Sequence, residues 1–156
     1  GRLGPGATPL MDIVIYAAGE IHSDWRVALR DHLQAAGVDA ELVGPQEDHD
    51  RSDDIGEQIL GKQPNPLYRD LQGARVNTLR TRVLMQRADL AVAYFGPKYK
   101  QWNTASAAGF ALASGLPLVM VRSQEHVHAL KELDALATLT VETIEQAAQA
   151  IAYIFE

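Results

Sequence analysis

The chain alternates between short, continuous apolar runs and stretches whose apolar residues recur at helical spacing. Continuous runs of this length are typical of parallel strands, which are buried on both faces of a sheet. The pattern predicts five strands, at residues 12–18, 41–43, 90–95, 118–121 and 139–141.

Helical spacing accounts for most of the chain between these runs. Ser23 or Asp24 can cap a first helix that continues to about Ala36, and Gly37 then ends it. Residues 46–73 follow neither pattern, apart from a short helix near 55–60, so they predict a long irregular segment of the kind that is usually functional or disordered. Further helices are predicted at about 74–87, 104–114 and 126–136, and from Thr143 to the C-terminus.

Alternation of apolar strands with helices predicts an α/β fold with a parallel sheet. With five strands and right-handed crossovers, we expect a single flavodoxin-like three-layer domain with the strand order 2-1-3-4-5. Ligands of such sheets bind beyond the carboxyl ends of the strands, at the switch point between strands 1 and 3. The segments to inspect for function are therefore 19–24, 45–54, 96–104 and 122–128.

Composition narrows the classes of function. The chain has 156 residues, 47% hydrophobic and 22% charged, as in an ordinary globular protein, and no cysteine, which excludes thiol catalysis and disulfides. A net charge of −6 argues against binding to duplex nucleic acid or a membrane surface. We expect a cytoplasmic protein without a cofactor, with one domain at 11–156. Residues 1–10 are rich in Gly and Pro and precede Met11, which suggests a tag remnant or disordered leader.

The first candidate segment combines Gly19, Glu20, His22 and Ser23 directly after strand 1. Glycine lets a ligand approach the backbone, and the start of a helix offers free N–H groups to an anion. Glu20 and His22 add a pair of acid/base groups. The competing interpretation is an ordinary capped turn. The chain has neither a G-x-G-x-x-G nor a Walker A motif, so the dinucleotide and P-loop interpretations lose their main support.

The second candidate segment, 49–54, is the most polar cluster of the chain. Its carboxylates suit a sugar's vicinal hydroxyls or, with His49, a divalent metal ion, although the spacing matches no specific metal motif. A solvated loop is the alternative. The candidate residues here are Asp50, Arg51 and Asp53.

Other candidates lie further along the chain. Trp102, beside the start of a helix, can stack on a base or sugar or can simply pack the loop. The small residues from Thr104 to Gly109 allow a close approach of a ligand or of another subunit. Asp89, His126 and His128 lie beside strand ends, where a turn or surface role is the alternative. Four arginines are candidates for binding an anion: Arg80, Arg82, Arg87 and Arg122.

The chain from residue 11 to 156 resembles the YtoQ family, whose members are similar to nucleoside 2-deoxyribosyltransferases. A weaker similarity to the wider transferase superfamily rests on 16–19, 88–89, 109–111 and 115–117. The segments that carry the specific resemblance are 18–23 with Trp25-Arg26, 43–45, 49–53, 80–81, 98–104, 130–133 and 153–156.

The resemblance implies a flavodoxin-like fold and cleavage of an N-glycosidic bond. In the wider family a glutamate two residues before the helix glycine attacks the anomeric carbon, and the glycosyl-enzyme passes to a base or to water. Here that position is Ala107. The family's earlier acidic residue falls at Gln101 and the following glycine at Asn103. Of the family's carboxylates, Asp89 alone has a match.

Another carboxylate must therefore act if the chain is an enzyme. The first hypothesis is a hydrolase or transferase of a nucleoside or nucleotide, with catalytic groups among Glu20, His22, Asp50 and Asp53. The alternatives are a nucleotide-binding module without catalysis and a metal-assisted hydrolase using His49, Asp50 and Asp53. The small-faced helix 104–113 and the resemblance also predict a homo-oligomer. The expected substrate-binding residues are Tyr16, Gly19, Ser23, Arg51, Arg80, Asp89, Trp102, Asn103 and Thr104.

Overall fold

The computed structural model describes residues 12–136 and 138–156, so the predicted leader at 1–10 lies outside the described residues. Its five strands form one parallel sheet in the order β2-β1-β3-β4-β5, which confirms the predicted order. Each strand lies within one residue of its predicted bounds. The strands are β1 (Ile13–Ala18), β2 (Ala40–Val43), β3 (Leu90–Phe95), β4 (Leu118–Arg122) and β5 (Leu139–Val141).

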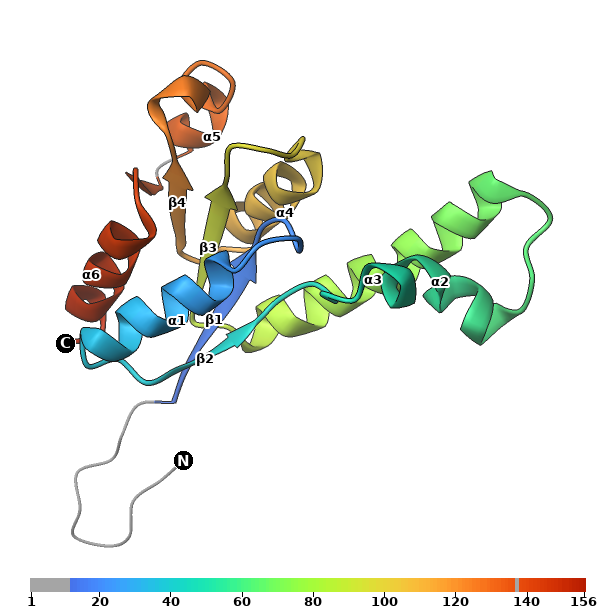
Figure 1. Ribbon diagram of the computed structural model, residues 1–156, viewed down its shortest axis with the longest axis horizontal. Coiled ribbons are helices and arrows are strands. Elements are labelled where there is room, and N and C mark those ends of the chain that lie inside the picture. The colour runs from blue at the N-terminus through green and yellow to red at the C-terminus, as the bar shows by residue number, and fades with distance from the viewer. Residues whose placement is uncertain (1–11, 137) are drawn as a thin grey trace, which may run out of the picture.

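Helices cover both faces of this sheet (Figure 1). On one face, Leu29 and Leu33 of the first helix and Ile151 of the last pack on Ile15 of β1. On the other face, side chains of the third and fourth helices meet Tyr16 of β1 in a second apolar cluster. The helices are α1 (Trp25–Ala35), α2 (His49–Leu60), α3 (Pro66–Arg87), α4 (Trp102–Ala113), α5 (Lys131–Ala135) and α6 (Ile144–Ile154), with a short 3-10 turn η1 (Gln124–His126).

The prediction of an irregular segment at 46–73 was wrong. The chain forms α2 and the first turns of α3 there, and the two helices make a hairpin that extends away from the sheet (Figure 1). Asp48 caps α2 by accepting a hydrogen bond from the Arg51 amide, and Asn65 caps α3 by accepting one from the Tyr68 amide. Residues that were interpreted as loop signals are therefore helix caps, with Pro66 in the first turn of α3.

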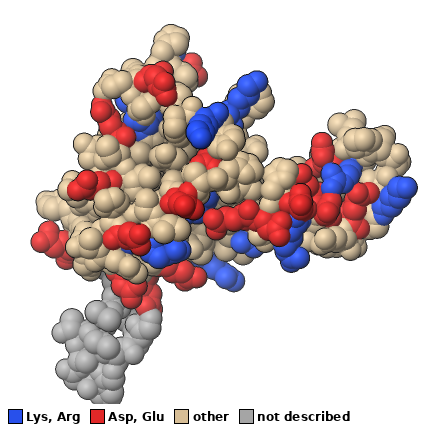
Figure 2. All heavy atoms as spheres, viewed as in Figure 1, with Lys and Arg blue, Asp and Glu red and all other residues tan. Residues whose placement is uncertain are grey.

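The hairpin is held by polar and close backbone contacts more than by an apolar core. A methyl group added at Gly56 would lie 2.6 Å from the Gly73 nitrogen, which shows how closely the two helices cross. The Asn77 amide donates to the Ser52 carbonyl at 3.0 Å, and Arg69 pairs with Glu57 at 3.0 Å. Figure 2 shows charges of both signs along this hairpin. The apolar periodicity of α3 is accordingly weaker than that of α1.

Apolar side chains remain exposed along the hairpin. Leu67 is 73% exposed, and Leu71 and Leu79 on the same helix are exposed as well.

The prediction of one continuous helix at 126–136 was wrong, because η1 and α5 with a turn between them replace it. Within the described ranges, no helix has both the length and the apolar character needed to cross a membrane.

Candidate functional site

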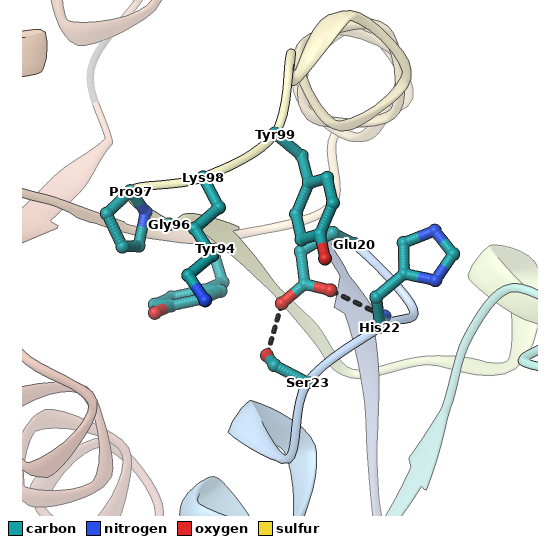
Figure 3. A pocket seen from close by; sticks show the side chains of 8 residues that line it. All are labelled: Glu20, His22, Ser23, Tyr94, Gly96, Pro97, Lys98 and Tyr99. Atoms are coloured by element: carbon teal, nitrogen blue, oxygen red, sulfur yellow. Dashed lines mark hydrogen bonds between the residues drawn. The ribbon is translucent and has the colours of Figure 1, made fainter.

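A cavity of about 200 Å³ opens at the carboxyl ends of β1 and β3. This is the switch point at which the strand order reverses, where ligands of such sheets bind. The loop after β1 forms one side of the cavity, and the end of β3 with its following loop forms the other (Figure 3). The lining residues are Glu20, His22, Ser23, Tyr94, Gly96, Pro97, Lys98 and Tyr99.

The Glu20 carboxylate is held in one orientation by its own loop. One oxygen accepts a hydrogen bond from the His22 amide at 2.6 Å, and the other accepts one from the Ser23 hydroxyl (Figure 3). Both donors belong to the turn that leads into α1. The predicted trio of Glu20, His22 and Ser23 therefore does come together on the cavity wall.

The first two residues of α1 are hydrogen-bonded to the backbone of this loop. The Trp25 indole N–H donates to the Glu20 carbonyl at 2.9 Å, and the Arg26 guanidinium donates to the same carbonyl at 2.8 Å. Gly19 has no room for a side chain, because an added methyl group would lie 2.5 Å from the Trp25 ring. The structure thus assigns this glycine a packing reason beside the predicted approach of a ligand.

The surroundings of two tyrosines, Tyr94 and Tyr16, raise their pKa values. Tyr94 lines the cavity and stacks on Trp25 with ring centroids 4.9 Å apart. Burial, together with the charge of Glu20, raises the pKa of Tyr94. Burial also raises the pKa of Tyr16, whose hydroxyl lies 3.3 Å from the Thr81 hydroxyl. Tyr16 belongs to the core cluster beside α3 and does not line the cavity.

The start of α2 lies beside the cavity. The His49 ring is 5.8 Å from the His22 ring, which in turn is 5.0 Å from the Tyr99 ring. Behind His49, the carboxylates of Asp53 and Asp50 lie 3.6 and 3.8 Å from its Nδ1. Neither aspartate lines the cavity. Arg51 is exposed on the same helix and does not line the cavity either.

The predicted residues after β3 lie beyond the cavity wall. Trp102 begins α4 with 74% of its surface exposed and with the Lys100 ammonium 5.0 Å from its ring. Asn103 is also exposed, and Thr104 is buried with its hydroxyl donating to Gln101 at 3.2 Å. Tyr99, three residues before Trp102, supplies the aromatic surface that faces the cavity (Figure 3).

Asp89 lies at the opposite end of the sheet. Its carboxylate accepts a hydrogen bond from the Val14 amide at 2.9 Å, and its own amide donates to the Val14 carbonyl at 2.8 Å. Both residues stand at the amino ends of their strands. The structure thus gives Asp89 a place in strand pairing, away from the cavity, where its predicted substrate-binding role finds no support.

The candidate anion clamps are dispersed. Arg122 pairs with Asp134 at 3.2 Å, and Arg82 lies 5.4 Å from the Phe110 ring. Arg80 approaches the Gly44 carbonyl at 3.5 Å. The remaining candidates are Arg87, which ends α3, His126, whose ring nitrogen is 3.4 Å from the Gly96 carbonyl, and His128, which is exposed.

Metal binding finds no ligand set here. Within the part of the chain that the structure describes, no three His, Asp or Glu side chains are grouped so that they could hold an ion. The metal-assisted hydrolase therefore lacks the cluster it would require.

Several residues of the site were not predicted from the sequence. Tyr94, Lys98 and Tyr99 line the cavity, and Arg26 secures its loop, yet none was among the predicted site residues. The segment 96–104 was selected correctly from its place after a strand, but no periodicity indicates which of its side chains turn inward.

Comparison with known proteins adds a family to this geometry. Residues 16–155 match a family model described as nucleoside 2-deoxyribosyltransferase YtoQ. The chain is 48% identical over 146 residues to the uncharacterised protein YtoQ of Bacillus subtilis (strain 168), with 94% of this chain and 99% of that protein covered. It is also similar to the crystal structure of a conserved protein from Enterococcus faecalis V583, with a TM-score of 0.60 and 19% identity, covering 92% of this chain and 99% of that one. The last similarity supports the fold alone.

Proposed function

Because the chain belongs to the YtoQ family of nucleoside 2-deoxyribosyltransferase-like proteins, we propose that it acts on the N-glycosidic bond of a nucleoside or nucleotide, with Glu20 as the essential carboxylate. The observation that carries the proposal is the orientation of Glu20. Its carboxylate is hydrogen-bonded at the wall of the cavity between β1 and β3, the place where this fold binds ligands.

The chemistry needs one carboxylate near the anomeric carbon. In the proposed step the bond between that carbon and the base nitrogen breaks, its electron pair leaves with the base, and positive charge develops on the sugar. Glu20 either bonds covalently to the anomeric carbon or stabilises this charge electrostatically. A second base or a water molecule then takes the sugar and restores the carboxylate, which gives a transferase or a hydrolase respectively.

The departing base needs a proton. His22 lines the same cavity as Glu20, and an imidazole is a suitable donor near neutral pH. Its ring contacts those of Tyr99 and His49. We assign His22 the role of general acid. Asp53 and Asp50 contact His49 and take a supporting electrostatic role.

The other wall suits the rest of a nucleoside. Tyr99 and Pro97 offer apolar surface to a base or sugar, and the Lys98 ammonium can pair with an anionic group. This proposal therefore assigns to Tyr99 the aromatic role that was predicted for Trp102.

A binding module without catalysis is the second candidate. The observation in its favour is Ala107, which stands on α4 at the position of the superfamily's nucleophile and cannot replace it. In that case the same cavity binds a nucleotide without breaking it.

Base release distinguishes the two candidates. The wild-type protein is incubated with ribo- and deoxyribonucleosides and their 5′-monophosphates, with and without an acceptor base, and the products are separated by chromatography. Glu20→Gln keeps the shape of the side chain and removes its charge, and its single amide oxygen can accept only one of the two hydrogen bonds that the carboxylate accepts. Glu41→Gln, on an exposed position of β2, is the matched control.

We expect release by wild type and by Glu41→Gln, and a loss of at least about a hundredfold in Glu20→Gln, as for a removed nucleophile. Full activity of Glu20→Gln would contradict the assignment of Glu20. Nucleotide binding measured by calorimetry, without release from any member of the panel, would favour the binding module.

We also propose that the chain forms a homo-oligomer. The support is the exposed apolar side chains of the hairpin, Leu67, Leu71 and Leu79, since large exposed apolar groups mark interaction surfaces. The predicted interface on α4 receives less support, because Ala108 and Ala111 are buried in the core. A monomeric mass in light scattering would contradict this proposal.

A further inference from the structure

Arg26, in the first turn of α1, is a cation with only 7% of its surface exposed. Burial of a guanidinium is costly unless its hydrogen-bonding groups are well used. The same burial lowers the pKa of Arg26, while the nearby Glu47 carboxylate acts in the opposite direction. A charged group kept in such a place calls for an explanation from its contacts.

The terminal nitrogens of the guanidinium are hydrogen-bonded to the backbone that carries Glu20, whereas its buried Nε has no hydrogen-bond partner among the described residues. The guanidinium donates to the carbonyls of Ala17 at 2.9 Å, Gly19 at 3.0 Å and Glu20 at 2.8 Å. Pairing of β1 with β2 ends at Tyr16. β1 still pairs with β3 as far as Ala18, so Arg26 takes the place of β2 as a hydrogen-bonding partner of the chain beyond Tyr16.

A second side chain of α1 adds to these hydrogen bonds. Trp25 donates to the Glu20 carbonyl, and its ring centre lies 4.5 Å from the Arg26 guanidinium carbon, within the range of a cation–π contact. The Trp25 ring also stacks on Tyr94, which lines the cavity. The two α1 residues thus connect both sides of the cavity.

We infer that Arg26 is a positioning residue, which fixes the backbone from Ala17 to Glu20 and thereby aims the Glu20 carboxylate into the cavity. Its effect on catalysis rests on the proposed function, whereas its effect on the loop does not. A lysine is a poor substitute, since a single ammonium lacks the planar fork with which arginine reaches several acceptors.

The experiment combines hydrogen exchange with kinetics on Arg26→Gln and Arg26→Lys. Arg30→Gln is the matched control, because Arg30 lies one turn further along α1 and is exposed. Exchange is followed in the segment 18–24, which includes the His22 amide bonded to Glu20, and in α6 as a reference for global stability. Steady-state base release gives kcat and KM separately.

For Arg26→Gln we expect exchange at 18–24 to be at least tenfold faster, α6 to change less than twofold, and kcat to fall at least tenfold with KM within threefold. For Arg26→Lys, the exchange rate at 18–24 and kcat should lie between those of Arg26→Gln and wild type. For Arg30→Gln, both should match wild type. Loop exchange within twofold of wild type, or an equal acceleration in α6, would overturn the inference.

Two further arms keep the test decisive. If Arg26→Gln does not fold, Trp25→Phe removes the indole donor to Glu20 while keeping a ring, and severalfold faster exchange confined to 18–24 is expected. An unchanged exchange rate at 18–24 in Trp25→Phe would then contradict the inference that hydrogen bonds from α1 fix this loop. If wild type shows no base release, the proposed function fails, and the exchange result still decides whether Arg26 holds the loop.

Discussion

The two sides of the cavity are built in different ways. Residues 19–26, here called the fixed wall, are bound to one another through the carboxylate of Glu20, the indole of Trp25 and the guanidinium of Arg26. Residues 96–102, here called the open wall, have sparser bonding. Gln101 donates to the Gly96 carbonyl only at 3.5 Å, and Tyr99 is 44% exposed.

This contrast separates two tasks that a site must perform. A group that acts on a reacting atom works best when its supporting residues hold it in place before the substrate arrives. A surface that contacts the rest of a substrate benefits from side chains that can adjust, which loops provide. Glu20 belongs to the fixed wall, and Lys98 and Tyr99 belong to the open wall.

The largest effect is expected from crowding the fixed wall. In Gly19→Ala the new methyl group would lie 2.5 Å from the buried Trp25 ring, so we expect a loss of about 1–3 kcal/mol in the free energy of unfolding. Gly109→Ala is the control within α4, where nothing lies within 4 Å, and it should stabilise by about 0.5–1 kcal/mol. Urea denaturation measures the free energy of unfolding of both variants. An unchanged value for Gly19→Ala would show that the fixed wall can rearrange to accommodate the methyl group.

A smaller effect, on binding, is expected from the open wall. Tyr99→Ala removes an exposed aromatic ring, so stability should stay within about 0.5 kcal/mol of wild type. A base stacked on this ring would lose about 1 kcal/mol, or roughly fivefold in KM or Kd. Tyr153→Ala removes an exposed ring on α6 and should change neither quantity. Unchanged affinity in Tyr99→Ala would remove Tyr99 from the substrate contacts.

The smallest effect connects the two walls electrostatically. The charge of Glu20 contributes to the raised pKa of Tyr94, so Glu20→Gln should lower that pKa, which stays above its ordinary value because burial persists. The ¹³Cζ shift of Tyr94, followed by NMR as pH is raised, measures the change, and Glu41→Gln should leave the pKa as it was. An unchanged pKa in Glu20→Gln would mean that the carboxylate is turned away from Tyr94.

The sheet could be predicted because its residues follow a simple rule. Strands buried on both faces are continuously apolar, and the run at 90–95 is too short for a buried helix and is followed by Gly96 and Pro97. The hairpin α2–α3 could not be predicted in the same way. Gly56 and Gly73 let its helices approach closely, and polar pairs such as Arg69 with Glu57 replace the apolar stripe that helix prediction depends on.

The site could be predicted only in part for a related reason. Glu20, His22 and Ser23 are neighbours in sequence, so their proximity follows from one turn. Asp89, which matched a family carboxylate, was placed at the far end of the sheet by strand pairing with Val14. The contact of Arg26 with three carbonyls depends on where the β1–β2 ladder ends, which apolar patterning does not specify.

The hairpin has a consequence for how the chain folds. β1 and β3 pair in the centre of the sheet, and the Asp89–Val14 bond beside them closes a separation of 75 residues. The hairpin of α2, α3 and the loop between them, residues 49–87, makes up about half of the intervening chain, and its contacts are more local: Arg69 and Glu57 are 12 residues apart, and Asn77 and Ser52 are 25. Contacts between near neighbours form early, and each formed segment lowers the entropy that a later long-range closure must overcome. We therefore expect the protruding helix pair to act as a local folding unit that shortens the effective loop between the two central strands.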